Sequence, residues 1–149
     1  MMSTQSYTPD TAAADALEAL HDRSVDVLAG FDTMVGKAEP EFRPLAMRFQ
    51  ELHRRHSTEL AGLLAAAGRT PGNEGTFMST VNRAVVSLRS IFDDIDEDIL
   101  AQVESGEQHV LDAFDEALAQ PQAPDARAKL SDMRQELVRL LDEAKATRA

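Results

Sequence analysis

The sequence predicts an all-α fold, a four-helix bundle whose long helices run up, down, down and up, with a short fifth helix between the second and the third. Three observations predict it. Aromatic residues make up only 5% of the 149 residues, while helix formers such as Ala, Leu, Glu and Arg are abundant. Apolar residues recur at helical spacing in four long segments, without the alternation of a strand. The connections between these segments are short, long and short.

The first long helix is expected at about residues 10–37, with Asp10 or Thr11 as its N-cap. Residues 1–9 are rich in Ser and Thr and end at a proline, so we expect a flexible N-terminal tail there. The rest of the chain, residues 10–148, has the size and the apolar content of a single helical-bundle domain.

The second long helix begins between Pro40 and Pro44 and ends at Gly68, which suits the position just after a helix. A loop rich in Gly and Pro follows, and then a short amphipathic helix is expected. The expected ranges are 68–76 for this loop, 77–92 for the short helix, Asp94 or Asp96 to Gln120 for the third long helix, and 125–146 for the fourth, after Pro124 at its first position.

The connection lengths predict the directions of the helices. Short turns make the first and second helices antiparallel, and likewise the third and fourth. A sixteen-residue helix at 77–92 covers roughly 24 Å at about 1.5 Å per residue, enough to return along the bundle. The second and third long helices are therefore expected to be parallel, and this short, long, short connectivity is ferritin-like.

Composition and charge exclude several classes of function. A formal net charge of −11 argues against binding nucleic acid or an anionic membrane, and the arginines at 43, 48, 54 and 55 are interpreted as a solvated helix face. The absence of cysteine excludes disulfides and thiolate metal sites. No segment offers the roughly 20 apolar residues that span a bilayer, and no secretory signal opens the chain, so we expect a cytoplasmic protein.

Ligand-type side chains on the inner faces of the helices raise the question of a metal site. A ferritin-like di-iron centre takes one Glu from each of two helices and a Glu-x-x-His pair from each of the other two. At about 100° per residue, His56 and Glu107 point to the bundle centre, and His21 and Glu59 lie at the flanks. No Glu-x-x-His occurs, and the acidic residues of the first and fourth helices face outward.

Two interpretations of His56 and Glu107 follow. The first is a buried polar pair, in which the two side chains hydrogen-bond at mid-bundle, with the carboxylate raising the histidine pKa and burial lowering it. The second is a non-standard site for a single metal ion (iron, manganese or zinc), which His21 and Glu59 would help to hold. The first interpretation implies no cofactor.

Two stretches, ELAGLLAAAGRTPGNEGT and DEDILAQVESGEQHVLDAFDEAL, resemble a bacterial family of ferritin-like four-helix-bundle proteins of unknown function. The resemblance covers about Leu17 to Leu141. It rests on Glu59-Leu60, the Gly68 turn, and Glu104, Gly106 and Glu107, none of which is a catalytic signature. It implies the ferritin-like fold and no established activity.

We therefore expect a non-enzymatic ferritin-like bundle without a complete di-iron site, acting as a binding or stress-associated module. The alternative is a metal-binding or oxidoreductase bundle with its site around His56 and Glu107. Either protein would interact with a protein partner or with a second copy of itself through its amphipathic helices, and with neither nucleic acid nor membrane.

Overall fold

The computed structural model describes residues 3–69 and 100–148. They form four helices: α1 (Ser3–Lys37), α2 (Arg43–Ala66), α4 (Leu100–Ala119) and α5 (Pro124–Arg148). No strand occurs in these two ranges, which confirms the all-α prediction. None of these helices is both long and apolar enough to cross a membrane.

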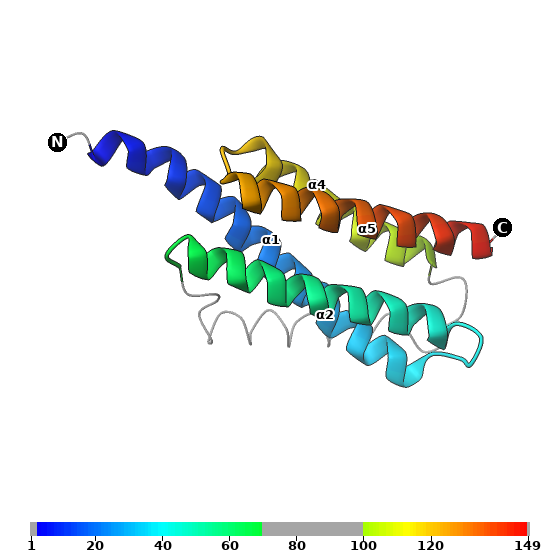
Figure 1. The fold of residues 1–149 in the computed structure, drawn as a ribbon. Coiled ribbons are helices and arrows are strands. Elements are labelled where there is room, and N and C mark those ends of the chain that lie inside the picture. The colour runs from blue at the N-terminus through cyan, green and yellow to red at the C-terminus, as the bar shows by residue number, and fades with distance from the viewer. Residues whose placement is uncertain (1–2, 70–99, 149) are drawn as a thin grey trace.

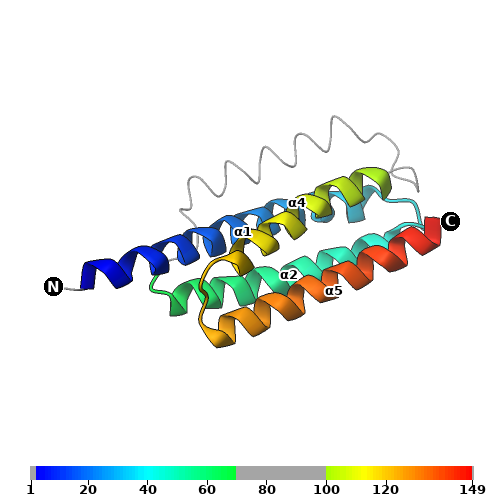
Figure 2. The same ribbon diagram turned by 90° about the horizontal axis from the view of Figure 1, so that it is seen from above.

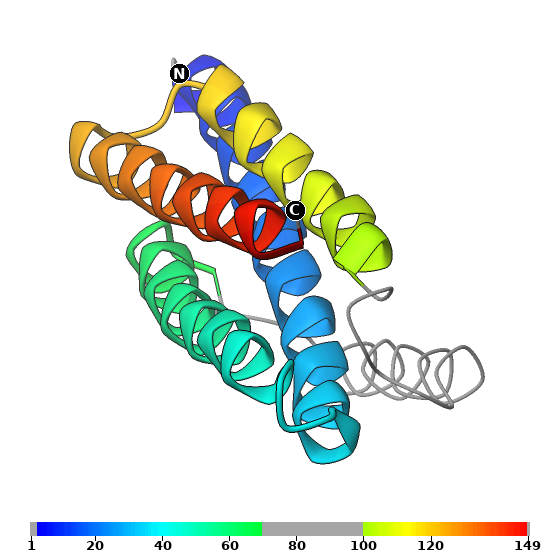
Figure 3. The ribbon, with the colours of Figure 1, turned by 90° about the vertical axis from the view of Figure 1, so that its right-hand side faces the viewer.

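The four helices lie side by side in a bundle (Figure 1, Figure 2). Colours followed along the chain show that α1 and α5 run in one direction and that α2 and α4 run in the other. Seen along the bundle in Figure 3, α1 lies between α2 and α4, and α5 lies between the same two helices on the other side. The helices α2 and α4 are therefore parallel, as expected, and face each other across a diagonal of the bundle.

Local chemistry explains where α2 begins and ends. Pro44 stands in its first turn, where the missing N–H needs no partner. At the other end Gly68 has φ +82°, its N–H donates to Ala65 O, and the N–H of Arg69 donates to Leu64 O at 2.9 Å. These two bonds form a Schellman motif, which confirms Gly68 as the residue that ends the helix.

Some expected boundaries change. The helix α1 begins at Ser3 rather than near Asp10, so the expected N-cap at Asp10 or Thr11 lies inside it. Pro9 therefore lies inside this helix and not before it. Pro124 does occupy the first position of α5, as predicted. The expected short helix at 77–92 lies outside the described residues.

Aromatic and aliphatic side chains from all four helices fill the core. Phe31 of α1 and Phe49 of α2 stack with ring centroids 5.1 Å apart, and Phe114 of α4 is fully buried. The fully buried leucines of the described helices are Leu20, Leu60, Leu64, Leu100, Leu130 and Leu137. Among the described residues Met47 is the one large apolar side chain that is exposed. Five buried residues are polar, and they lie at the level of the candidate site.

Candidate functional site

The buried face of α2 carries two histidines one helical turn apart. Phe49, His53, His56 and Leu60 follow the three- and four-residue spacing that keeps side chains on one side of a helix, and all four are fully buried. His53 and His56 thus occupy positions where a bundle normally places aliphatic residues. Buried polar side chains need partners, so each imidazole must find one inside the protein.

His53 finds its partner across the diagonal of the bundle. Its Nε2 lies 2.6 Å from Glu107 Oε2 of α4, and the two side chains are 0% and 1% exposed. Two lone pairs would repel at this distance, so a proton lies between the two atoms. The sequence paired Glu107 with His56, and that prediction is wrong: the partner of Glu107 is the histidine one turn earlier.

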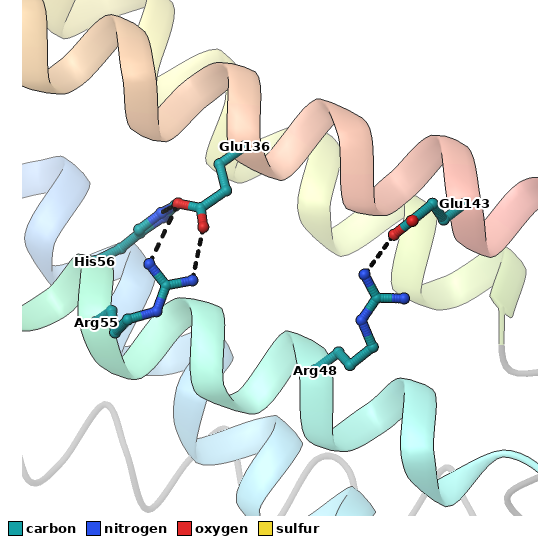
Figure 4. A network of polar contacts seen from close by, with 5 residues as sticks. All are labelled: Arg48, Arg55, His56, Glu136 and Glu143. Carbon is teal, nitrogen blue, oxygen red and sulfur yellow. Dashed lines mark hydrogen bonds and ion pairs between the residues drawn. The ribbon is translucent and has the colours of Figure 1, made fainter.

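His56 is bonded to α5 instead of α4. Its Nε2 lies 2.8 Å from Glu136 Oε1 (Figure 4). The sequence placed Glu136 outside the buried seam, which agrees with its exposed fraction of 40%, but it did not predict that the carboxylate reaches His56. A rotation angle describes the direction of Cα–Cβ, but two methylene groups let the carboxylate reach inward while the side chain stays 40% exposed.

An arginine at the surface shares the Glu136 carboxylate with His56. Arg55 Nη2 donates to Oε2 at 2.7 Å, and Nη1 donates to Oε1 at 3.5 Å (Figure 4). Oε1 therefore accepts from both His56 and Arg55. This carboxylate connects a fully buried imidazole to a guanidinium that is about half exposed.

The electrostatics of this group follow from burial and charge. The hydrogen bond from Arg55 lowers the pKa of Glu136, and the bond from His56 lowers it further, although partial burial opposes both. Burial lowers the pKa of His56, the bond to Glu136 opposes this, and His53 and Arg55 lower it again. At neutral pH an ionised Glu136 can only accept, so we assign the Nε2–H tautomer to a neutral His56.

Aromatic rings hold both imidazoles in place. The His53 ring stacks on Phe31 at 5.8 Å between centroids, and it stands nearly perpendicular to the His56 ring at 6.3 Å. The His56 ring in turn meets Phe114 edge to face at 6.2 Å. The polar groups are thus enclosed by apolar ring surfaces, which exclude water and strengthen the electrostatic interactions between them.

Several polar atoms in this centre have no hydrogen-bond partner among the described residues. They are Nδ1 of His53, Nδ1 of His56, Oε1 of Glu107 and the hydroxyl of Ser24, a fully buried residue of α1. Counting about 1.5 Å per residue from the α1–α2 turn places Ser24 at the height of the two histidines. Buried atoms of this kind call for an explanation, such as an ion or water that binds there.

The sequence also offered Glu59 and His21 as flanking ligands of a metal site. Glu59 is exposed and takes no part in the centre. His21 is buried on α1, and its Nδ1 lies 3.2 Å from Asp22 Oδ1. Sequence reasoning missed His53 and Glu136 as members of this centre, although the spacing His53-x-x-His56 placed both imidazoles on one helix face.

The centre consists of two hydrogen-bonded pairs, His53 with Glu107 and His56 with Glu136. Across residues 3–69 and 100–148, no three His, Asp or Glu side chains are grouped closely enough to hold a metal ion as they stand. The position on α1 that would supply a carboxylate carries Ser24, and one turn after Glu136 comes Arg139 instead of a histidine. This part of the chain therefore lacks the ferritin-like di-iron set.

The arginines on the exposed side of α2 contact acidic side chains. The contacts are Arg48 with Glu143 at 2.5 Å, Arg54 with Glu51 at 2.9 Å, and Arg55 with Glu136 at 2.7 Å. This agrees with their interpretation as a solvated helix face; the fourth arginine of that set, Arg43, donates instead to the carbonyl of Ala38 at 2.7 Å.

Comparison with known proteins finds one family. The model of a family described as a domain of unknown function, DUF2383, matches residues 12–120, which span α1, α2 and α4. No curated protein matches the chain. No solved structure matches it either.

Proposed function

The chain belongs to the DUF2383 family, and on that premise we propose that it is a non-enzymatic, ferritin-like bundle that binds a single divalent metal ion at mid-bundle. The ligands are His53, His56, Glu107 and Glu136. Two imidazoles and two carboxylates suit zinc, iron or manganese. The helix directions support the ferritin-like arrangement, in which sites form between facing helices.

One observation carries this proposal. Two fully buried histidines, one turn apart on α2, each present Nε2 to a carboxylate oxygen, and these carboxylates come from two different helices. An aliphatic core would fill the same space without placing four ionisable groups there. Glu107 Oε1, which has no hydrogen-bond partner among the described residues, is a further oxygen that could coordinate the ion.

The spacing of the imidazoles can be compared with that of a shared ion. With bonds of about 2.0–2.1 Å and tetrahedral angles, two imidazoles on one ion have ring centroids about 5 Å apart. The rings of His53 and His56 are 6.3 Å apart. The two Nε2 atoms face carboxylates on different helices, Glu107 on α4 and Glu136 on α5, so one shared ion would require both imidazoles to rotate toward each other.

When bound, the ion would supply a positive charge that compensates Glu107 and Glu136 inside the bundle. The chain's own part is to hold the ligands: α2 positions both imidazoles, while Phe31 and Phe114 fix their ring planes. No described group accepts a hydrogen bond from either Nδ1, so helix packing and the aromatic rings do the orienting that a second shell often does.

The test is metal binding by untagged, full-length protein. After removal of metals with EDTA, zinc, manganese and iron(II) are titrated separately by calorimetry, and protein purified without chelator is analysed for metal. We expect one ion per chain, lost in His53→Ala and His56→Ala. His109→Ala is the matched control, since His109 is exposed on α4 two residues from Glu107. No stoichiometric binding, or binding that the core variants leave intact, would overturn the proposal.

Partners and location stay predictions. Self-association through the amphipathic helices is tested by sedimentation at several concentrations, where a monomer at high concentration contradicts it. A stress-associated role and a cytoplasmic location also stay predictions, open to growth assays and imaging of a labelled chain.

A further inference from the structure

Two hollows lie on different faces of the bundle and differ in what lines them. The α2/α5 groove, of about 630 Å³, is lined mostly by charged side chains, among them Arg55 and Glu136. The α1/α4 pocket, of about 300 Å³, lies between α1 and α4, which are neighbours in Figure 3. Its described lining includes both apolar side chains and Glu107, and its size is that of a site for a small molecule.

The walls of the α1/α4 pocket are apolar. Val27, Phe31 and Met34 follow one stripe of α1 at three- and four-residue spacing, and Val103 lines the pocket from α4. Gly106, three residues after Val103, also lines the pocket, and a Cβ built there would meet no atom within 4 Å. A glycine in a helix interior, where it is otherwise unfavourable, thus leaves this space open.

One polar atom of this lining lacks a partner. Glu107 is 1% exposed, and its Oε1 has no hydrogen-bond partner among the described residues. Its Oε2 is held by His53 at 2.6 Å, so the carboxylate cannot turn toward another donor without breaking that bond. Wherever the shared proton lies, Oε1 stays an acceptor. A donor that enters from the pocket would therefore satisfy a buried group that is costly to leave unpaired.

The charges around the pocket favour a cation over an anion. Glu107 and Asp26 contribute two carboxylates to the lining, against one guanidinium from Arg23, whose side chain is exposed to solvent. Solvent weakens the charge of Arg23, whereas burial strengthens the interactions of Glu107. The formal net charge of the whole chain, −11, adds a long-range attraction for cations.

From this arrangement we propose that the α1/α4 pocket binds a small primary amine, whose ammonium group donates to Glu107 Oε1 while its apolar body packs against Phe31 and Val103. The volume admits about ten non-hydrogen atoms, at roughly 30 Å³ each as in liquid water. An ammonium group joined to one aromatic ring or to a short alkyl chain has this size. The inference goes beyond metal binding, because the pocket and the free oxygen are present in the metal-free protein.

The experiment titrates 2-phenylethylamine, which is cationic at neutral pH, into full-length protein labelled with nitrogen-15, in EDTA, and follows the amide shifts by NMR. We expect saturable binding, with the largest shift changes at Gly30 and Gly106, which both line the pocket. The probes 2-phenylethanol and phenylacetate are similar in size but carry a hydroxyl or a carboxylate in place of the ammonium. The alcohol should bind about tenfold more weakly, because its hydrogen bond is not charge-assisted, and phenylacetate should not bind.

Two pairs of variants locate the site. Glu107→Gln removes the charge but keeps the shape, and it should raise the Kd for the amine at least about tenfold; Glu116→Gln, exposed on the same helix, should leave the Kd unchanged. Gly106→Leu fills the open space and should abolish binding. Gly62→Leu is its matched control, at an exposed glycine of α2 with equally open surroundings, and should bind as wild type does. Thermal unfolding identifies the variants that fold, and Glu107→Gln and Gly106→Leu each test the site independently.

The outcomes separate this proposal from the metal site. No saturable binding of the amine, or equal binding of 2-phenylethanol or phenylacetate, overturns it. Binding that Glu107→Gln or Gly106→Leu leaves unchanged overturns it too, as does an equal loss in Glu116→Gln or Gly62→Leu, because the effect would then not be local. Since EDTA is present throughout, a failure here leaves the metal proposal untouched, and a failure of zinc binding in calorimetry leaves the amine site standing.

Discussion

The bond between His53 and Glu107 should prove strongly coupled in the metal-free protein. Both side chains are almost fully buried, and the atoms are 2.6 Å apart. Removing one partner leaves the other unpaired in an apolar core, so His53→Leu and Glu107→Leu should each cost about 3–5 kcal/mol of unfolding free energy. Replacing both residues removes the buried charge and its partner together, so the double variant should lie near or above wild-type stability.

The assay is urea unfolding followed by circular dichroism, in EDTA, on wild type, both single variants and the double variant. We expect a coupling energy of several kcal/mol, far above the few tenths that separate independent sites. Arg134 and Asp115 form the control cycle: their ion pair, with N–O distance 2.7 Å, is largely exposed, and its coupling should stay below about 1 kcal/mol. Additive effects at His53 and Glu107 would refute the reasoning, because the pair would then not be a unit.

Three further predictions concern the metal-free protein. Burial lowers the pKa of His56, so the unfolded chain binds a proton there at a higher pH than the folded protein does. The free energy of unfolding should therefore fall as the pH drops from about 6.5 toward the pKa of the folded state. Urea midpoints between pH 5 and 7.5 should show this slope, and His56→Leu should flatten it. Gly68→Ala should cost about 1 kcal/mol through φ +82° alone, because no atom lies within 4 Å of the added methyl group; a neutral result in urea unfolding would contradict this. Phe114→Ala should cost about 3–5 kcal/mol by creating a cavity, whereas Met47→Ala, half exposed, should stay within about 0.5 kcal/mol; similar midpoints would refute this.

Helices and their ends were predictable because their causes are local. Apolar spacing identified α1, α2, α4 and α5, Gly68 marked the end of α2, and Pro124 marked the start of α5. Connection length then predicted which helices are parallel. The start of α1 was not predictable in this way, because Pro9 discourages a helix without forbidding one.

The pairing inside the core was harder, because it depends on differences of a single helical turn. Counted from the expected starts of the second and third long helices, His56 lies about fourteen residues into its helix and Glu107 about eleven into its own. The two positions therefore differ by three residues. Three residues correspond to about 4.5 Å along the axis. That offset separates His56 from His53, the residue that Glu107 contacts. Helix rotation showed which residues face inward, but longitudinal register decided the partner.

The two His–Glu pairs differ in how much of each pair is exposed to solvent. The side chains of His53 and Glu107 are 0% and 1% exposed, and both residues lie within the range that the DUF2383 model matches. His56 is equally buried, but its partner Glu136 opens onto the α2/α5 groove and lies beyond the matched residues. A pair with so little exposure exchanges protons or ions slowly, whereas Glu136 and Arg55, 40% and 49% exposed, can separate by side-chain motion alone. An ion that entered through the α2/α5 groove would meet Glu136 and His56 first, whereas one that entered through the pocket of about 300 Å³ between α1 and α4 would meet Glu107 first. For entry through the groove, Glu136→Gln should slow zinc association, whereas Glu107→Gln should mainly speed its release; the reverse pattern in stopped-flow traces would rule out entry through this groove.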